Sequence, residues 1–170
     1  MKGTVILSHG LDSGPGATKV SALAEVACGL GWHELRPDYR DLDARRDVRD
    51  IDARIARLLQ CAPQAGRVVF AGSSMGAFTS ALASLQRPCA GLFLIALPGA
   101  IPGYPRSLAA AAVPTACVHG WQDALCPVDA VIAFARERAA SLHLLPDDHR
   151  LAGHVAECAR LFAQFLQRLD

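Results

Sequence analysis

The segment 68–76, with the sequence VVFAGSSMG, constrains the fold more than any other stretch of the chain. Its first four residues are apolar and predict a strand buried on both faces, and apolar residues at helical spacing follow it. The Gly-x-Ser-x-Gly pattern therefore falls where a strand turns sharply into a helix, which is typical of a nucleophile elbow. The frame of the pattern selects Ser74 as the nucleophile and leaves Ser73 as its neighbour. The alternative is a glycine-rich loop that binds an anion at a helix N-terminus.

The composition indicates one well-buried domain over residues 1–170. Hydrophobic residues make up 52% of the chain and charged residues 19%, which argues against disorder. The net charge of +1 gives no electrostatic footprint for nucleic acid or an anionic membrane, so neither is expected as a partner. The first residues enter a short strand without a secretory leader, and the longest apolar stretch, 91–101, is too short to span a bilayer. We therefore expect a cytoplasmic protein.

Six cysteines are scattered through predicted strands and helices. They lack the paired spacing of a zinc site, so no metal centre is expected. Buried reduced thiols are the simplest interpretation, and a disulfide framework is the alternative.

Apolar runs alternate with helical patterns along the whole chain. The expected strands lie at residues 4–7, 32–36, 68–71, 91–96, 115–119 and 142–145. The expected helices lie at residues 20–30, 48–59, 75–85, 128–139 and 151–169, and the segment 97–113 is expected to be a loop with at most a short helix at 107–112. This alternation predicts an α/β fold, a three-layer α/β/α sandwich with a mostly parallel sheet of about six strands.

In such a sheet the functional site lies beyond the carboxyl ends of the strands. Asp123 follows the fifth expected strand, and His149 lies in the loop after the last one. One imidazole nitrogen of His149 could reach Ser74 and the other Asp123, in the chain order Ser, Asp, His of hydrolases with this elbow. The alternative role for Asp123 is a helix N-cap.

Other side chains near His149 could take part in the same chemistry. His154 is the rival base, but it falls in the first turn of the last helix rather than in the loop where a base has to sit. Asp147 and Asp148 are rival acids, but they adjoin His149 in the chain and lack the reach to align its ring from behind. We therefore assign His149 as the base and Asp123 as the acid.

Acyl transfer also needs two backbone N–H groups that receive an oxyanion. Met75, the residue after the nucleophile, is expected to supply one of them. The loop after the first strand, His9-Gly10-Leu11, is expected to supply the other through Leu11 N–H. The alternative is that this stretch is only a flexible glycine loop.

Taken together, these motifs resemble the α/β-hydrolase superfamily. The matching segments are HGL at 9–11, GSSMG at 72–76, HGWQD at 119–123 and DDHRL at 147–151. The resemblance is closest to small, lidless bacterial hydrolases near the dienelactone-hydrolase-like and YqiA-like esterases. The chain departs from the usual pattern of the family in two ways. We expect no N-terminal antiparallel hairpin, because the first strand already carries the oxyanion loop, and no cap domain, because only residues 97–114 separate the fourth and fifth strands. With these departures the resemblance implies a trimmed α/β-hydrolase fold with a shallow, open site. The candidate substrate-binding residues, beside Leu11 and Met75, are Asp12, Leu97, Pro98 and Cys126.

The function expected on these grounds is that of a serine hydrolase of the carboxylesterase or thioesterase type. It would cleave small or exposed acyl esters through an acyl-enzyme and would need no cofactor. The alternatives are an amidase or peptidase with the same three residues, or a non-catalytic binding module on the same fold. The oligomeric state stays open, with a homodimer among the states that the sequence allows.

Overall fold

Six strands form one sheet at the centre of the computed structural model, which describes residues 1–169. Their order across the sheet is β2-β1-β3-β4-β5-β6, and every neighbouring pair is parallel. The strands are β1 (Thr4–Ser8), β2 (His33–Leu35), β3 (Val68–Ser73), β4 (Gly91–Ile95), β5 (Thr115–Gly120) and β6 (Ser141–Leu145). The expected parallel sheet of six strands is thereby confirmed.

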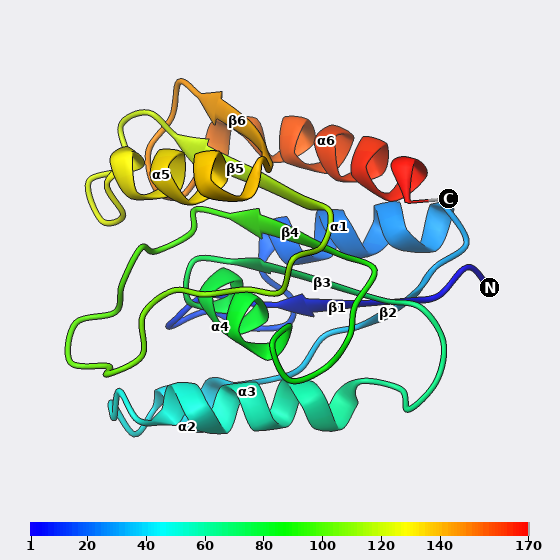
Figure 1. Cartoon of the computed structure of the whole chain (residues 1–170), viewed down its shortest axis with the longest axis horizontal. Helices are drawn as coiled ribbons and strands as arrows, with labels where there is room; N and C mark the ends of the chain where they lie inside the picture. The colour runs from blue at the N-terminus through cyan, green and yellow to red at the C-terminus, as the bar shows by residue number, and fades with distance from the viewer. Residues whose placement is uncertain (170) are drawn as a thin grey trace.

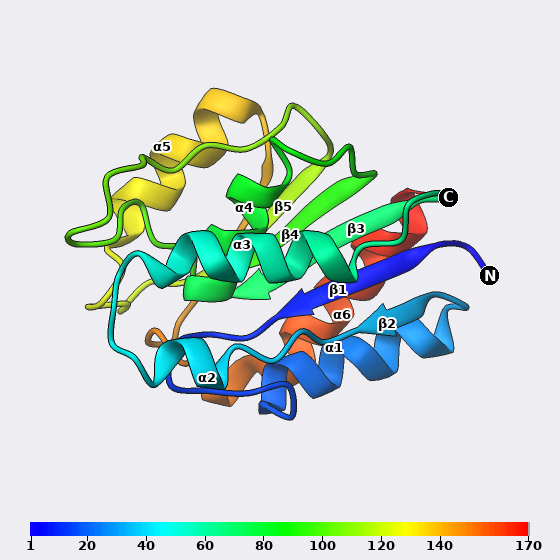
Figure 2. The same cartoon turned by 90° about the horizontal axis from the view of Figure 1, so that it is seen from below.

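Helices connect the strands and cover both faces of the sheet (Figure 1). They are α1 (Thr18–Gly29), α2 (Arg40–Asp43), α3 (Asp50–Cys61), α4 (Met75–Ala83), α5 (Val128–Arg138) and α6 (Val155–Arg168), with a 3-10 turn at Ala152–His154 before the last. Figure 2 shows α1 and α6 together on one side of the strands and α3, α4 and α5 on the other. This is the expected three-layer arrangement, and no cap domain covers the sheet edge within the described residues.

The alternation of side chains along β3 explains why the molecule has a core on each face. Val69 and Ala71 pack into the cluster under α1 and α6, whereas Val68 and Phe70 pack into the cluster under α3, α4 and α5. Successive side chains of a strand point to opposite faces, so a strand buried on both sides must be apolar throughout. That is why the segment VVFA at 68–71 could be recognised in the sequence as a strand buried on both faces.

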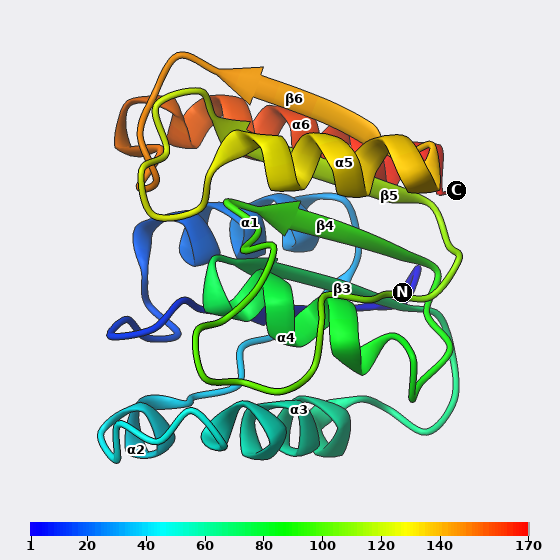
Figure 3. The ribbon, with the colours of Figure 1, turned by 60° about the vertical axis from the view of Figure 1, so that its left-hand side comes forward.

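The loop 97–113 contains no helix, which agrees with the expected loop. Two local details differ from the sequence-based expectation. Helix α4 ends at Ala83, so Leu85 lies beyond it with 49% of its surface exposed. The charged stretch before α3 contains the short helix α2, which lies at the start of α3 (Figure 3).

The chain reverses its direction of winding between β1 and β3. The connection after β1 leads to α1 on one face, and the connection after β3 leads to α4 on the other. At such a switch point the two loops diverge and leave a crevice beyond the carboxyl ends of the strands. The segment 9–11 and Ser74 both lie at this point.

Within residues 1–169, no helix combines the length and the apolar character needed to cross a lipid bilayer.

Candidate active site

Ser74 occupies a sharp turn between β3 and α4. Its φ is 55° and its ψ is −121°, a backbone conformation that residues with a Cβ rarely adopt. The turn is fixed by a hydrogen bond of 2.8 Å from Ser74 N–H to the carbonyl of Ile95. The hydroxyl is thus projected from the backbone beyond the end of the sheet, the geometry expected of an elbow.

The two glycines that flank Ser74 are required by close backbone contacts. A Cβ on Gly72 would lie 2.4 Å from the backbone of Gly76, and a Cβ on Gly76 would lie 2.1 Å from the carbonyl oxygen of Ser8. Side chains cannot be accommodated at such distances, so β3, the start of α4 and the end of β1 can approach one another only with glycine at both positions.

The structure brings Ser74, His149 and Asp123 together. The Nε2 atom of His149 lies 2.9 Å from Ser74 Oγ, and its Nδ1 atom lies 2.7 Å from Asp123 Oδ2. The imidazole therefore bridges the hydroxyl and the carboxylate, although 75 positions separate His149 from Ser74. Such a constellation can transfer the hydroxyl proton to the ring and stabilise the imidazolium that forms.

The carboxylate of Asp123 is fully buried and accepts hydrogen bonds on both oxygens. Its Oδ1 atom accepts the backbone N–H groups of Leu125 at 3.0 Å and Cys126 at 2.7 Å, which fixes the side chain within its own loop. Helix α5 begins only after Pro127 and has no side-chain cap. One oxygen thus anchors the loop and the other faces His149, so the N-cap alternative is not what the structure shows.

His119 is a second histidine beside Asp123. It is fully buried, and its Nε2 atom lies 2.7 Å from the carbonyl oxygen of Cys126 and 3.2 Å from Asp123 Oδ2. Because a carbonyl oxygen only accepts, Nε2 carries the hydrogen, which also faces the carboxylate. The HGWQD segment held the signal for this contact, since it places a histidine four residues before the aspartate.

The loop that carries His149 is held by the rival residues considered above. His154 Nδ1 lies 2.7 Å from Asp147 Oδ2, and the same oxygen accepts Gly153 N–H at 3.1 Å. The hydrogen bond from His154 lowers the pKa of the Asp147 carboxyl. His154 and Asp147 therefore pair with each other, and His149 is the histidine that reaches Ser74.

The expected oxyanion donors lie beside Ser74. A Cβ on Gly10 would lie 3.5 Å from Ser74 Cβ, so the segment 9–11 passes directly over the serine. Met75 is the first residue of α4, whose N–H has no acceptor within the helix. Within residues 1–169, neither Leu11 N–H nor Met75 N–H donates a hydrogen bond.

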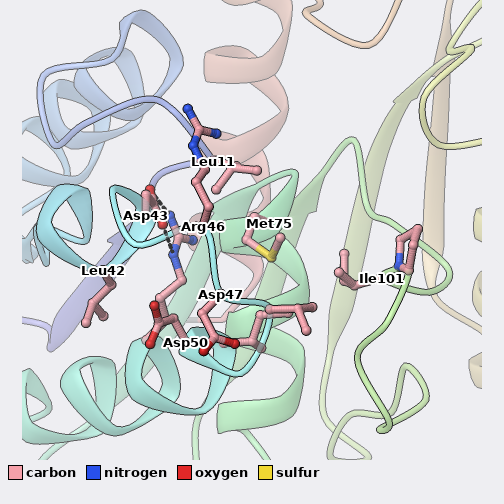
Figure 4. Close-up of a pocket in the computed structure, with 12 residues that line it drawn as sticks. Leu11, Leu42, Asp43, Arg46, Asp47, Asp50, Met75 and Ile101 are labelled. Atoms are coloured by element: carbon pink, nitrogen blue, oxygen red, sulfur yellow. Dashed lines mark hydrogen bonds and ion pairs between the residues drawn. The ribbon is translucent and has the colours of Figure 1, made fainter.

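A cavity of about 240 Å³ opens next to Leu11 and Met75 (Figure 4). Its apolar lining residues are Leu11, Leu42, Val48, Ile51, Met75, Ile101 and Pro102. Its acidic lining residues are Asp43, Asp47 and Asp50, and each of them is ion-paired with an arginine. The cavity is therefore apolar and electrically balanced.

Of the expected pocket residues, Leu11 and Met75 line this cavity and the other four do not. Leu97 and Pro98 are buried, because the chain after β4 turns into the core and reaches the cavity only at Ile101. Cys126 is also buried. Asp12 lies at the edge, where it pairs at 2.8 Å with the lining residue Arg46. The walls come instead from the segment around α2 and α3.

Asp123, Cys126 and His149 place three potential metal-ligand atoms within 4.8 Å of one another. A thiol must lose its proton to bind a metal, but burial and the neighbouring Asp123 charge raise the pKa of Cys126 to about 11. The carboxylate and the imidazole already bond to each other. Asp123 and His149 therefore fit a hydrogen-bonded pair better than two ligands of a metal ion.

Comparisons with known proteins agree with this geometry. The chain is 49% identical to a candidate hydrolase of the alpha/beta superfamily from Xanthomonas campestris pv. campestris, over 98% of this chain and 99% of that one, with a TM-score of 0.93. It shares its fold with Est1E of Butyrivibrio proteoclasticus, at 17% identity over 98% and 87% of the two chains and a TM-score of 0.72. It also shares its fold with the esterase Pf2001 of Pyrococcus furiosus, at 18% identity over 98% and 82% and a TM-score of 0.78. No protein-family model and no curated protein matches the chain. At 49% identity over almost the whole length of both proteins, the first of these similarities shows that the chain belongs to the alpha/beta hydrolase superfamily.

Proposed function

We propose that this protein is a serine hydrolase of the carboxylesterase or thioesterase type. The observation that carries the proposal is the hydrogen-bonded series of Ser74, His149 and Asp123, with distances of 2.9 and 2.7 Å. The strained backbone of Ser74 supports it, because a φ of 55° in a residue with a Cβ needs compensation from the surrounding structure. Superfamily membership supports hydrolysis in general, and the esterases among its structural relatives favour an ester as the scissile group.

In the proposed mechanism His149 Nε2 removes the proton of Ser74 while the serine oxygen attacks the acyl carbon. The oxyanion of the tetrahedral intermediate accepts hydrogen bonds from Leu11 N–H and Met75 N–H. His149 then donates its proton to the leaving alkoxide or thiolate, and an acyl-enzyme remains. Water activated by the same histidine releases the acid, and Asp123 stabilises the imidazolium in both halves of the cycle.

The cavity beside Leu11 and Met75 supports an uncharged acyl group as the bound part of the substrate. A basic substituent would find no free carboxylate in it, because each of its three carboxylates is already paired with an arginine. An acidic substituent would find no free cation, because the two lining arginines, Arg46 and Arg54, are paired with Asp12 and Asp43. Its volume of about 240 Å³ is below the range of about 300–1,000 Å³ that is usual for drug-sized ligands. A short aliphatic acyl chain is therefore the substrate class that suits this site.

The test is labelling with a fluorophosphonate probe together with hydrolysis of p-nitrophenyl butyrate. We expect the wild type to be labelled and active, and Ser74→Ala to lose both properties while it keeps its circular dichroism spectrum. Ser73→Ala is the matched control, since the residue precedes the turn by one position, and it should keep both properties. An unlabelled wild type that hydrolyses no ester or thioester would favour the binding-module alternative, and turnover of amides alone would favour the amidase.

A further inference from the structure

Arg54 is a buried charge in the middle of α3, where only 1% of its surface is exposed. Arginine is almost never fully buried unless it is paired. Here its Nε and Nη2 atoms donate to the two carboxylate oxygens of Asp43, each at 2.9 Å. This bidentate contact neutralises the charge and fixes the plane of the guanidinium.

The remaining donors of Arg54 point to the segment 9–11. Its Nη1 atom donates to the carbonyl of His9 at 3.2 Å, and its Nη2 atom also donates to the carbonyl of Gly10 at 3.3 Å. The carbonyl of Gly10 and the N–H of Leu11 belong to the same peptide group. A trans peptide is planar and holds these two groups in opposite directions, so a donor that holds Gly10 O also fixes the direction of Leu11 N–H.

Two aromatic rings complete this contact. Tyr39 lies under the guanidinium, with its ring centroid 4.4 Å from the central carbon of Arg54. His9 accepts Tyr39 N–H on Nε2 at 3.0 Å, so Nδ1 carries the hydrogen and donates it to Gly10 O at 2.8 Å. The carbonyl of Gly10 thus accepts from both His9 and Arg54, which leaves its peptide group little freedom to rotate.

We propose that Arg54 is a positioning residue for catalysis, which holds the Gly10–Leu11 peptide so that Leu11 N–H faces the oxyanion formed at Ser74. This inference rests on the proposed function. Arg54 acts through geometry rather than through its charge, because Asp43 neutralises it. A lysine could keep a positive charge near Asp43, but its single ammonium group cannot reproduce the planar fork that bonds Asp43 and both carbonyls together.

The expected effect is therefore on the chemical step. A misdirected Leu11 N–H weakens the bond to the oxyanion and changes ground-state binding little. In Arg54→Met and Arg54→Lys we expect kcat for p-nitrophenyl butyrate to fall by about 10- to 100-fold, within the range for a lost oxyanion donor, while KM changes by less than about twofold. The Ki of a trifluoromethyl ketone, which forms an oxyanion on the serine, should rise by the same factor as kcat/KM falls.

Arg160 provides the control, since it is also an arginine in a bidentate contact with a carboxylate but lies in α6, on the other face of the sheet. Its Nε and Nη2 atoms donate to the carboxylate oxygens of Glu157 at 2.8 and 2.6 Å. Arg160→Met should keep kcat within twofold of the wild type.

Each variant is first checked for folding by thermal melting. The fraction of protein molecules that the fluorophosphonate probe finally labels is also measured, because it counts the molecules whose Ser74 can react. If Arg54→Met does not fold, Arg54→Lys carries the test. A folded Arg54 variant with wild-type kcat, or one whose loss of activity equals its loss of competent serines, would overturn the positioning role. Failure of the proposed function would look different, because the wild type itself would then react with neither probe nor ester.

Discussion

Asp123 accepts the Nδ1–H of His149 on one carboxylate oxygen at 2.7 Å, while its other oxygen accepts two backbone N–H groups of its own loop. The carboxylate can therefore hardly rotate, and it imposes one tautomer on the imidazole. With hydrogen on Nδ1, the Nε2 atom is left as an acceptor toward Ser74 Oγ. The direction of proton transfer in the proposed mechanism follows from this one contact.

We expect Asp123→Asn to lower kcat by about 10⁴-fold, because an amide that keeps its oxygen on the loop turns its NH₂ group toward His149 and favours the wrong tautomer. The measurement is kcat for p-nitrophenyl butyrate, with the melting temperature as the check on folding. Asp148→Asn is the control, since Asp148 is exposed and its side chain accepts the backbone N–H of Arg150 rather than a group of the candidate active site. A decrease of less than tenfold in Asp123→Asn would contradict the proposed role of the carboxylate.

His149 and His154 should differ strongly in their effect on activity. We expect His149→Ala to lose at least about 10⁴-fold in kcat, because Ser74 then has no base. His154→Ala removes only the bond to Asp147 and should keep most of the activity. The measurement compares both variants on p-nitrophenyl butyrate at pH 7.5. If His154→Ala were inactive and His149→Ala active, the assigned base would be the wrong one.

The elbow and its partners could be predicted because their signals are local. Two glycines around Ser74, an apolar strand before it and a histidine just after the last strand can all be recognised within a few residues. The sheet edge then brings Asp123 and His149 together, because all the strands are parallel. Neither step requires knowledge of a distant contact.

The cavity and the Arg54 contact could not be predicted because they depend on tertiary packing. Arg54 bonds to carbonyls 44 and 45 positions away, and backbone carbonyls have no signature in the sequence. Its charge also lies in a stretch dense in arginine and aspartate, which resembles a solvated surface. Leu97 was expected among the substrate-binding residues, but the loop after β4 carries it into the core.

Gly76→Ala should destabilise the protein. The new Cβ would lie 2.1 Å from Ser8 O and 2.6 Å from His9 O, both backbone atoms that cannot move without shifting β1. We expect the free energy of unfolding in urea to fall by about 2–3 kcal/mol or more. Gly29→Ala is the control, since its Cβ position at the end of α1 has no described atom within 4 Å apart from its chain neighbours and the backbone of its own helix, and it should gain up to about 1 kcal/mol. Equal stability of the two variants would contradict the close approach of α4 and β1.

Ile101→Trp should shorten the acyl chain that the enzyme prefers. Ile101 lines the cavity from a half-exposed loop position, so an indole there can fill the space without disturbing the core. We expect the ratio of kcat/KM for p-nitrophenyl hexanoate to that for the acetate to fall by about tenfold. Leu85→Trp, an exposed position beyond the far end of α4, is the control and should leave the ratio unchanged. An unchanged ratio in Ile101→Trp would show that the acyl chain binds elsewhere.

His9 couples the segment 9–11 to pH. Burial is the main cause that lowers its pKa below 6.5, and the Arg54 charge acts in the same direction. The hydrogen bond to the Gly10 backbone and the charges of Asp43 and Asp38 oppose the shift without cancelling it. The folded protein thus resists protonation of a ring whose Nε2 atom must accept Tyr39 N–H.

We therefore expect the free energy of unfolding to fall as the pH is lowered from 7 to 5. Below 6.5 the unfolded chain binds a proton at His9 that the folded chain takes up only at lower pH, so the stabilisation is complete above 6.5 and is lost as the pH falls toward the folded-state pKa. His9→Gln keeps an acceptor without a titrating group, and its urea unfolding should depend less steeply on pH. The pKa of His143 is also lowered, first by burial and then by Arg160, so His143→Gln measures that separate contribution. If His9→Gln kept the full wild-type slope between pH 7 and 5, protonation of His9 would not be a source of acid sensitivity.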